Sequence, residues 1–171
     1  MKERDGLVTI NGNPVTLLGN EVKVGDTAPD FTAIANDLSA VTLKDYKGKV
    51  VVLSAVHSLD TSICDTETRT FNQEAAALGE DVKILTISMD LPFAQKRWCA
   101  AAGIDRVETL SDHRDASFGE EYGVLIKGKR LLARAVFVAD KDGIVQHAQL
   151  LEEVASEPDY QSVLDAVKKL L

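Results

Sequence analysis

The sequence has few of the residues that mark a metal-binding, secreted or membrane protein. Its two cysteines and three scattered histidines lack the spacing of a zinc site, and we expect neither a metal ion nor a cofactor. No apolar run reaches the roughly 18 residues of a membrane span. No apolar segment follows the charged residues 1–5, so we expect no signal peptide and a cytoplasmic protein without membrane contact.

Positive charge is also scarce. The chain has 19 Lys and Arg against 27 Asp and Glu, and the net charge of −8 at pH 7 argues against nucleic acid as a partner. A length of 171 residues favours a single domain over residues 1–171, large enough for a proper hydrophobic core. In a cytoplasmic chain, two cysteines are more often redox-active or catalytic than structural.

The hydrophobic pattern predicts an α/β fold with parallel strands. Apolar, β-branched runs at residues 49–56 and 82–88 are typical of buried strands. Between them we expect a helix that begins at Thr61 or Ser62 and ends at Gly79. Its expected buried face consists of Ile63, Phe71, Ala75 and Leu78. A strand, a helix and a strand in this order form a βαβ unit with a right-handed crossover.

The remaining elements complete a thioredoxin-like layout. An Asn-Gly turn at residues 11–12 predicts an N-terminal β-hairpin extension over residues 1–18. We further expect short strands at 31–34, 41–43 and 107–110, helices at 92–102, 115–122 and 158–171, a long strand at 131–139 and an antiparallel return strand at 144–151. The predicted fold class is therefore α/β, with a central mixed β-sheet flanked by helices.

Cys64 stands in the first turn of the helix that follows the strand at 49–56. Free amide N–H groups and the positive end of the helix dipole favour an anion there, and a thiolate is such an anion. A free cysteine has a pKa of about 8.5, which a helix N-terminus or a cationic neighbour can lower to roughly 3.5–7.5. The alternative is a small buried hydrophobic residue. Position alone leaves both interpretations open.

Three further residues have a catalytic interpretation beside a structural one. Arg134 lies in an apolar strand, where it either forms a salt bridge with an acid such as Glu67 or places a cation near the thiolate. Thr61 is either a helix cap or a hydrogen-bond donor to the sulfur or to a bound oxygen. Cys99 belongs to a different predicted helix from Cys64, so the two form no CxxC pair, and alone it is best interpreted as a core residue.

Several segments together resemble one known family. Residues 58–64, Ser-Leu-Asp-Thr-Ser-Ile-Cys, resemble the peroxiredoxin active-site loop, whose pattern is Pro-x-x-x-Thr-x-x-Cys. Residues 91–99 resemble the resolving-cysteine segment of the bacterial thiol peroxidases, which are atypical two-cysteine peroxiredoxins, and residues 132–138 resemble their arginine strand. Shorter matches occur at 13–16, 25–31, 109–112 and 157–160, so the resemblance covers nearly the whole chain.

The resemblance implies a chemistry and a set of roles. It implies that Cys64 is the peroxidatic cysteine and Cys99 the resolving cysteine, with Thr61 and Arg134 completing the catalytic group. The implied reaction reduces hydrogen peroxide or an alkyl hydroperoxide through a Cys64 sulfenic acid and a Cys64–Cys99 disulfide. The implied partners are thioredoxin, as the reductant, and a second copy of the chain in a homodimer.

The sequence departs from the family pattern at His57, which occupies the position of the motif proline. Protonated histidine could help the thiolate form, the ring could crowd the site or aid proton transfer, or a looser loop could slow the reaction and favour over-oxidation. We expect peroxidase activity that persists but is reduced, with some pH dependence between about 5.5 and 7.5. A redox sensor or weak peroxidase therefore remains an alternative.

Apolar residues near the two cysteines suggest a place for larger substrates. We expect Phe93 and Trp98 to pack around the resolving helix and, with His57 and Ile63, to contribute to substrate binding. A thiol-disulfide oxidoreductase is a further alternative, but such enzymes normally have a CxxC pair, and Cys64 is followed by Asp-Thr-Glu.

Overall fold

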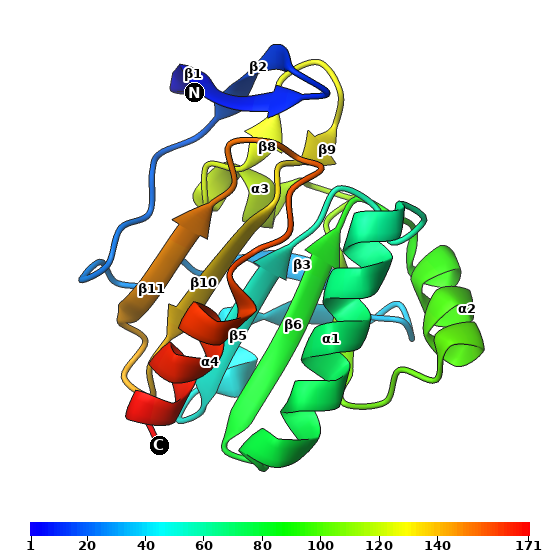
Figure 1. The fold of residues 1–171 in the computed structure, drawn as a ribbon, viewed down its shortest axis with the longest axis vertical. Coiled ribbons are helices and arrows are strands. Elements are labelled where there is room, and N and C mark those ends of the chain that lie inside the picture. Colours follow the sequence, from blue (N-terminus) through cyan, green and yellow to red (C-terminus); the bar gives the residue numbers. More distant parts are fainter.

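A seven-stranded mixed sheet forms the centre of the protein in a computed structural model that describes residues 1–171, except for the side chain of Ala76 (Figure 1). Its strands are β3 (Thr32–Ile34), β4 (Ala40–Thr42), β5 (Val50–Ala55), β6 (Val82–Ser88), β7 (Val107–Ser111), β10 (Ala135–Ala139) and β11 (Val145–Leu150). They are arranged in the order β11-β10-β5-β6-β7-β3-β4, and β5, β6 and β7 are parallel. The predicted mixed sheet and its βαβ unit are confirmed.

Helices cover both faces of this sheet. They are η1 (Leu43–Tyr46), α1 (Ser62–Leu78), α2 (Pro92–Ala102), α3 (Ser117–Glu121) and α4 (Tyr160–Lys169). In Figure 1, α1 and α4 lie in front of the sheet, α3 lies behind it, and α2 stands beside α1. Proline at the start of α2 and a left-handed Gly103 at its end match the expected boundaries, because proline suits a first helical turn and glycine readily adopts positive φ. Among the described residues, no helix is both long and apolar enough to cross a bilayer.

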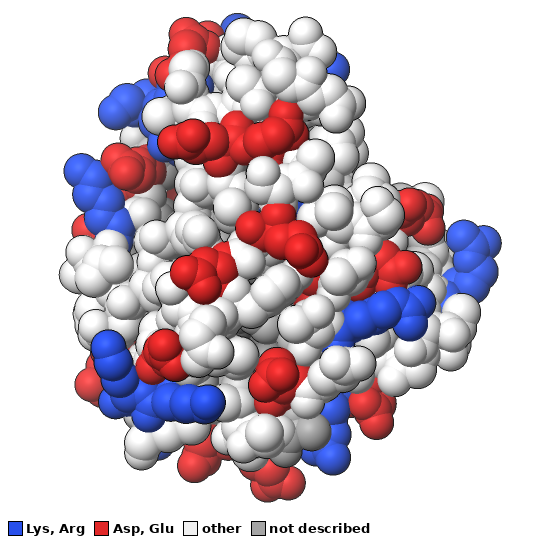
Figure 2. Space-filling model, viewed as in Figure 1, with Lys and Arg blue, Asp and Glu red and all other residues white. Residues whose placement is uncertain are grey.

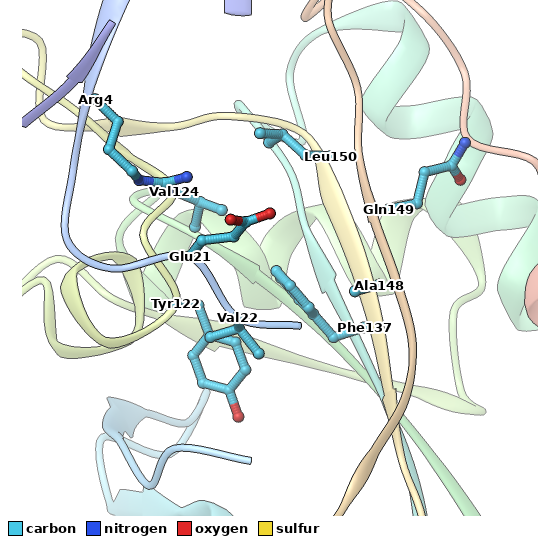
Figure 3. A pocket seen from close by; sticks show the side chains of 9 residues that line it. All are labelled: Arg4, Glu21, Val22, Tyr122, Val124, Phe137, Ala148, Gln149 and Leu150. Atoms are coloured by element: carbon cyan, nitrogen blue, oxygen red, sulfur yellow. The ribbon is translucent and has the colours of Figure 1, made fainter. Parts of the chain in front are cut away.

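The N-terminal hairpin belongs to a second, four-stranded sheet that the sequence did not indicate. It consists of β1 (Glu3–Ile10), β2 (Asn13–Leu18), β8 (Leu125–Ile126) and β9 (Leu131–Leu132). The Asn-Gly turn that predicted the hairpin has positive φ at both residues, as such turns require. Arg4 anchors β1 by donating to the carbonyls of Gly19 and Gly123, at 3.0 and 2.5 Å, and Figure 3 shows it reaching across from this strand.

The long strand predicted at 131–139 is in fact two strands. Leu131–Leu132 pairs with β8 in the small sheet, whereas Ala135–Ala139 pairs with β5 and β11 in the large one. The prediction of one continuous strand was wrong because the local apolar pattern carries no information about which sheet each end joins. The break leaves Arg134 between the two sheets.

The buried face of α1 also differs from the prediction in its first turn. Cys64, Glu67, Thr68 and Phe71 are buried, while Ile63 is only half-buried. These buried positions follow the three- and four-residue spacing of one helical face, and Ile63 precedes that face by one residue. The polar Glu67 was left out of the predicted face because an unpaired carboxylate is costly to bury.

Candidate active site

Cys64 is held at the start of α1, directly after the loop that follows β5. Its side chain is fully buried, with 0% exposed. Thr61 is the N-cap residue, as its position predicted, but its hydroxyl donates to the carbonyl of Ser58 at 2.8 Å and does not cap the helix. The loop is tied to the end of β6 because Asp90 accepts hydrogen bonds from Ser58 and from the Leu59 amide.

Arg134 is the only fully buried arginine among the described residues, and it contacts Cys64 directly. Its Nη2 donates to the Cys64 sulfur at 3.0 Å, its Nη1 donates to Glu67, and its Nε donates to the carbonyl of Val154 at 2.9 Å. Both interpretations of Arg134 therefore hold at once: it forms a buried salt bridge and also places a cation beside the sulfur. A guanidinium is suited to this position because it is planar and always charged.

The Glu67–Arg134 pair is embedded in polar contacts that make its burial tolerable. Ser54 on β5 donates to Glu67 at 2.7 Å. Burial raises the pKa of Glu67, and the cation of Arg134 and the Ser54 hydroxyl offset part of that rise. Burial works to lower the pKa of Arg134, but Glu67 and Cys64 outweigh it and the pKa lies above its ordinary value. The guanidinium is therefore a permanent positive charge.

A cavity of about 310 Å³ opens at this site. Its lining residues are Ile10, Asn11, His57, Thr61, Ser62, Ile63, Arg134, Glu153, Val154 and Ala155. Four of the predicted site residues thus meet here. The contribution of residues 153–155 was missed, because the segment between β11 and α4 has no periodic pattern, and only its later residues 157–160 resembled the family.

His57 is half-buried at the edge of this cavity. Its Nδ1 lies 3.2 Å from the carbonyl of Leu132. Burial lowers the pKa of His57, and the positive charge of Arg134 adds to that effect, while the hydrogen bond to Leu132 opposes it. The ring is therefore neutral at pH 7, and it does not supply the positive charge that one of the expected outcomes required.

Cys99 lies on α2, and its direct hydrogen-bond partners are neutral. Its sulfur is 3.4 Å from the hydroxyl of Thr109 on β7, which in turn donates to Asn36 at 3.1 Å. Burial raises the pKa of the Cys99 thiol, and the hydrogen bonds with Thr109 and Asn36 offset part of the rise. Cys64 and Cys99 are both free thiols in this structure. Sequence reasoning did not connect Thr109 or Asn36 with Cys99, since each meets Cys99 only through the folding of the sheet.

The two aromatic residues predicted near α2 have different environments. Trp98 packs against an apolar group formed by Val56, Leu59 and Cys64, and the guanidinium of Arg69 lies 5.6 Å from its ring centroid. Phe93 is 67% exposed, so the expectation that it packs around the resolving helix was wrong. The first turn of α2 buries Pro92 and Gln95 and turns Phe93 outward. Neither aromatic residue lines the cavity beside Cys64.

Two other features can be compared with this site. The described residues contain no group of three or more His, Cys, Asp or Glu that could hold a metal ion. A smaller cavity of about 90 Å³, drawn in Figure 3, lies at the junction of the two sheets between Arg4, Glu21 and Phe137, and no cysteine lines it. Figure 2 shows acidic side chains over the whole viewed face, including its middle, and basic ones mostly towards its edges.

Comparison with known proteins gives a consistent result. The Redoxin family profile matches residues 23–164. The chain is 62% identical to the thiol peroxidase of Oceanobacillus iheyensis over 95% of its length and 98% of that protein, and 57% identical to the thiol peroxidase of Bacillus subtilis over 96% and 98%. A crystal structure of a peroxiredoxin-like protein from Aquifex aeolicus, 45% identical, superposes with a TM-score of 0.90 and covers 98% of this chain and 99% of that one.

Sequence identity and fold agree over nearly the full length of these relatives. A thiol peroxidase from Chromobacterium violaceum shares the fold at only 20% identity, with a TM-score of 0.83 over 95% of each chain. The chain therefore belongs to the thiol peroxidases, within the Redoxin family.

Proposed function

We propose that this thiol peroxidase reduces hydrogen peroxide and organic hydroperoxides with Cys64 as the attacking group. The observation that carries the proposal is the 3.0 Å contact from Arg134 to the Cys64 sulfur, which stabilises a thiolate inside an otherwise closed site. The cavity above it has apolar walls from Ile10, Ile63 and Val154, and these suit the alkyl part of an organic hydroperoxide.

The first step is an in-line displacement at oxygen. The Cys64 thiolate attacks the terminal peroxide oxygen, a sulfur–oxygen bond forms, and the oxygen–oxygen bond breaks. The leaving oxygen carries the negative charge away and takes up a proton to become water or an alcohol. Arg134 and the amides at the start of α1 are donors suited to stabilise that charge, and the Thr61 hydroxyl joins them if it turns away from the Ser58 carbonyl. The products are a Cys64 sulfenic acid and the reduced substrate.

The second step joins the two cysteines. Cys99 attacks the sulfenic sulfur, water leaves, and an intramolecular disulfide forms. A disulfide requires Cα atoms within about 7 Å, and the two residues lie on separate helices with the Cys64 side chain closed off. We therefore expect the first turn of α1 to unwind and α2 to shift on oxidation. Trp98, which packs beside Cys64, would report that change by fluorescence.

A dithiol partner then restores both cysteines by exchange. We assign this role to thioredoxin, place the reaction in the cytoplasm, and expect a homodimer of chains that each form a single domain over residues 1–171. The net charge of −8 argues against nucleic acid as a partner.

The proposal is tested by turnover of hydrogen peroxide and cumene hydroperoxide with thioredoxin, its reductase and NADPH. We expect the wild type to turn over, Cys64→Ser to lose activity, and Cys99→Ser to consume about one equivalent of peroxide and then stop, since it makes sulfenic acid without resolving it. If both variants retained full activity, the assignment would be overturned. Oxidation without thioredoxin-driven turnover in the wild type would favour a redox sensor instead.

A further inference from the structure

Three hydroxyl residues cross the sheet in a single row beneath α1 and α2. Ser54 on β5 is in register with Thr86 on β6, and Thr86 is in register with Thr109 on β7. Neighbouring strands are about 4.8 Å apart, so the row is short. Its first member bonds to Glu67 beside Cys64, and its last member contacts Cys99. One face of the sheet therefore carries both the peroxidatic and the resolving environments.

The hydrogen bonds around Thr109 have a definite direction. Its hydroxyl donates to the Asn36 side-chain carbonyl, which is an acceptor only, at 3.1 Å. The lone pairs of the Thr109 oxygen then remain for Cys99, 3.4 Å away, so the thiol donates to the hydroxyl in the reduced protein. Thr109 is 3% exposed, and bulk water therefore does not compete strongly for this bond.

The charges near Cys99 do not favour its thiolate. Asp37, Asp105 and Glu108 line the same cavity of about 460 Å³, from the β3–β4 loop, the segment after α2 and β7. Burial raises the pKa of the Cys99 thiol and so opposes its ionisation, and the carboxylates of the cavity add no charge that would favour a thiolate. The nearby basic groups are Lys96 on α2, whose charge contributes to the lowered pKa of Asp37, Arg69 over the Trp98 ring, and Lys83 at 4.0 Å from Glu108, and none of them is hydrogen-bonded to the Cys99 sulfur. A neutral donor in direct contact with the sulfur therefore matters more here than at Cys64.

We propose that Thr109 is a positioning residue for the resolving step: anchored by Asn36, it holds the Cys99 sulfur in the reduced protein and turns to donate to that sulfur when the proton leaves. This inference rests on the proposed role of Cys99. A hydrogen-bond donor to the thiolate favours ionisation of the thiol. Thr109 therefore increases the fraction of Cys99 present as the nucleophilic thiolate at a given pH. It acts through Cys99 and does not contact the peroxide site.

The test compares Thr109→Val, which removes the hydroxyl at nearly constant volume, with Thr109→Ser, which retains it. Stopped-flow tryptophan fluorescence after a peroxide pulse resolves sulfenic acid formation from disulfide formation. We expect Thr109→Val to slow disulfide formation by about two- to tenfold, which is the rate change expected from the loss of one hydrogen bond. The midpoint of that step's pH profile should also move upward, while sulfenic acid formation stays unchanged. Thr109→Ser should restore both the rate and the midpoint.

Peptide mass spectrometry on the same samples distinguishes a failure of the proposed function of Cys99 from a failure of the proposed role of Thr109. If the wild type forms no Cys64–Cys99 disulfide, the proposed function of Cys99 fails. If the disulfide forms in all proteins at one rate and with one pH midpoint, only the role of Thr109 is overturned. Should Thr109→Val fail to fold, Thr109→Ala removes the hydroxyl without adding a methyl group, and the same slowing and midpoint shift are expected.

Discussion

The two cysteines occupy contrasting environments, although they lie over one face of one sheet. Cys64 has a permanent cation against its sulfur, and that cation is balanced by a buried carboxylate. Cys99 has only a hydroxyl and an amide, surrounded by acidic side chains. The first environment places a hydrogen-bond donor with a positive charge against the sulfur, whereas in the second the burial of Cys99 raises the pKa of its thiol.

This difference matches the order of the two proposed reactions. The sulfur that meets peroxide must be a thiolate beforehand, whereas the sulfur that resolves the sulfenic acid is needed only afterwards. A neutral Cys99 is also less exposed to oxidation by peroxide itself. The contrast therefore supports the proposal that Cys64 reacts with the peroxide and Cys99 resolves the sulfenic acid.

The largest expected effect comes from changing the cation at Cys64. Arg134→Lys keeps a positive charge but does not reproduce three simultaneous directed donors to Cys64, Glu67 and Val154. We expect the rate constant for sulfenic acid formation to fall about 100-fold. Stopped-flow peroxide kinetics measure it, with Arg69→Lys as the control at an exposed arginine. If Arg134→Lys and Arg69→Lys formed sulfenic acid at equal rates, the proposed difference between the Cys64 and Cys99 environments would be contradicted.

The second effect concerns the stability of the same buried pair. Glu67→Gln leaves the Arg134 cation without its carboxylate at a site that is fully closed to solvent. Breaking a buried pair costs about 3–5 kcal/mol, so we expect a decrease in the free energy of unfolding of about that size. Urea denaturation of the reduced protein measures it. Asp65→Asn, which removes a partly exposed carboxylate paired with Arg69, should change it by less than about 1 kcal/mol.

A smaller effect is expected at His57. His57→Pro restores the motif residue, removes a polar ring from the cavity edge, and should raise the rate of sulfenic acid formation severalfold. Because burial lowers the pKa of His57, the ring takes up its proton at a pH below the ordinary value of about 6.5. Any pH dependence due to this ring therefore lies below that value, in the lower part of the range the sequence suggested.

The titration of His57 also has a definite sign for stability. The unfolded chain binds this proton more readily than the folded one, so folding stability is lost as the pH falls below about 6.5. His57→Gln, which does not titrate, should lose less stability than the wild type between pH 7 and pH 5 in thermal denaturation. Parallel curves for the two proteins would remove His57 from the pH response.

The smallest effect is expected in the middle of the hydroxyl row. Ser54 and Thr109 both have partners, but the Thr86 hydroxyl is buried with none among the described residues. Thr86→Val replaces an unsatisfied hydroxyl by a methyl group, and we expect a gain of about 1 kcal/mol in the free energy of unfolding. Denaturation of the reduced protein measures this, and a clear loss of stability would show that the hydroxyl has a partner in solution.

The sequence allowed prediction of the elements that local patterns determine. The strand and helix around Cys64 follow from a run of β-branched residues and a helical spacing ended by Gly79, and the structure has them as β5 and α1. The pairing of Arg134 with Glu67 was also foreseen, because a buried guanidinium needs a counter-ion.

The features that were missed depend on pairing between distant segments. The second sheet, the break before β10 and the contact of Asn36 with Thr109 join residues far apart in the chain. No local periodicity encodes such pairings. The outward position of Phe93 was missed for a similar reason, since its helix turns other residues towards the sheet.

The most direct test of the account is intact and peptide mass spectrometry after one equivalent of hydrogen peroxide, on the wild type and on Cys99→Ser. The account predicts loss of two hydrogens in the wild type, mapped to a Cys64–Cys99 link, and a sulfenic acid on Cys64 in the variant. Oxidation that begins at Cys99, or a Cys64 that stays reduced while simple thiols react equally fast, would contradict it.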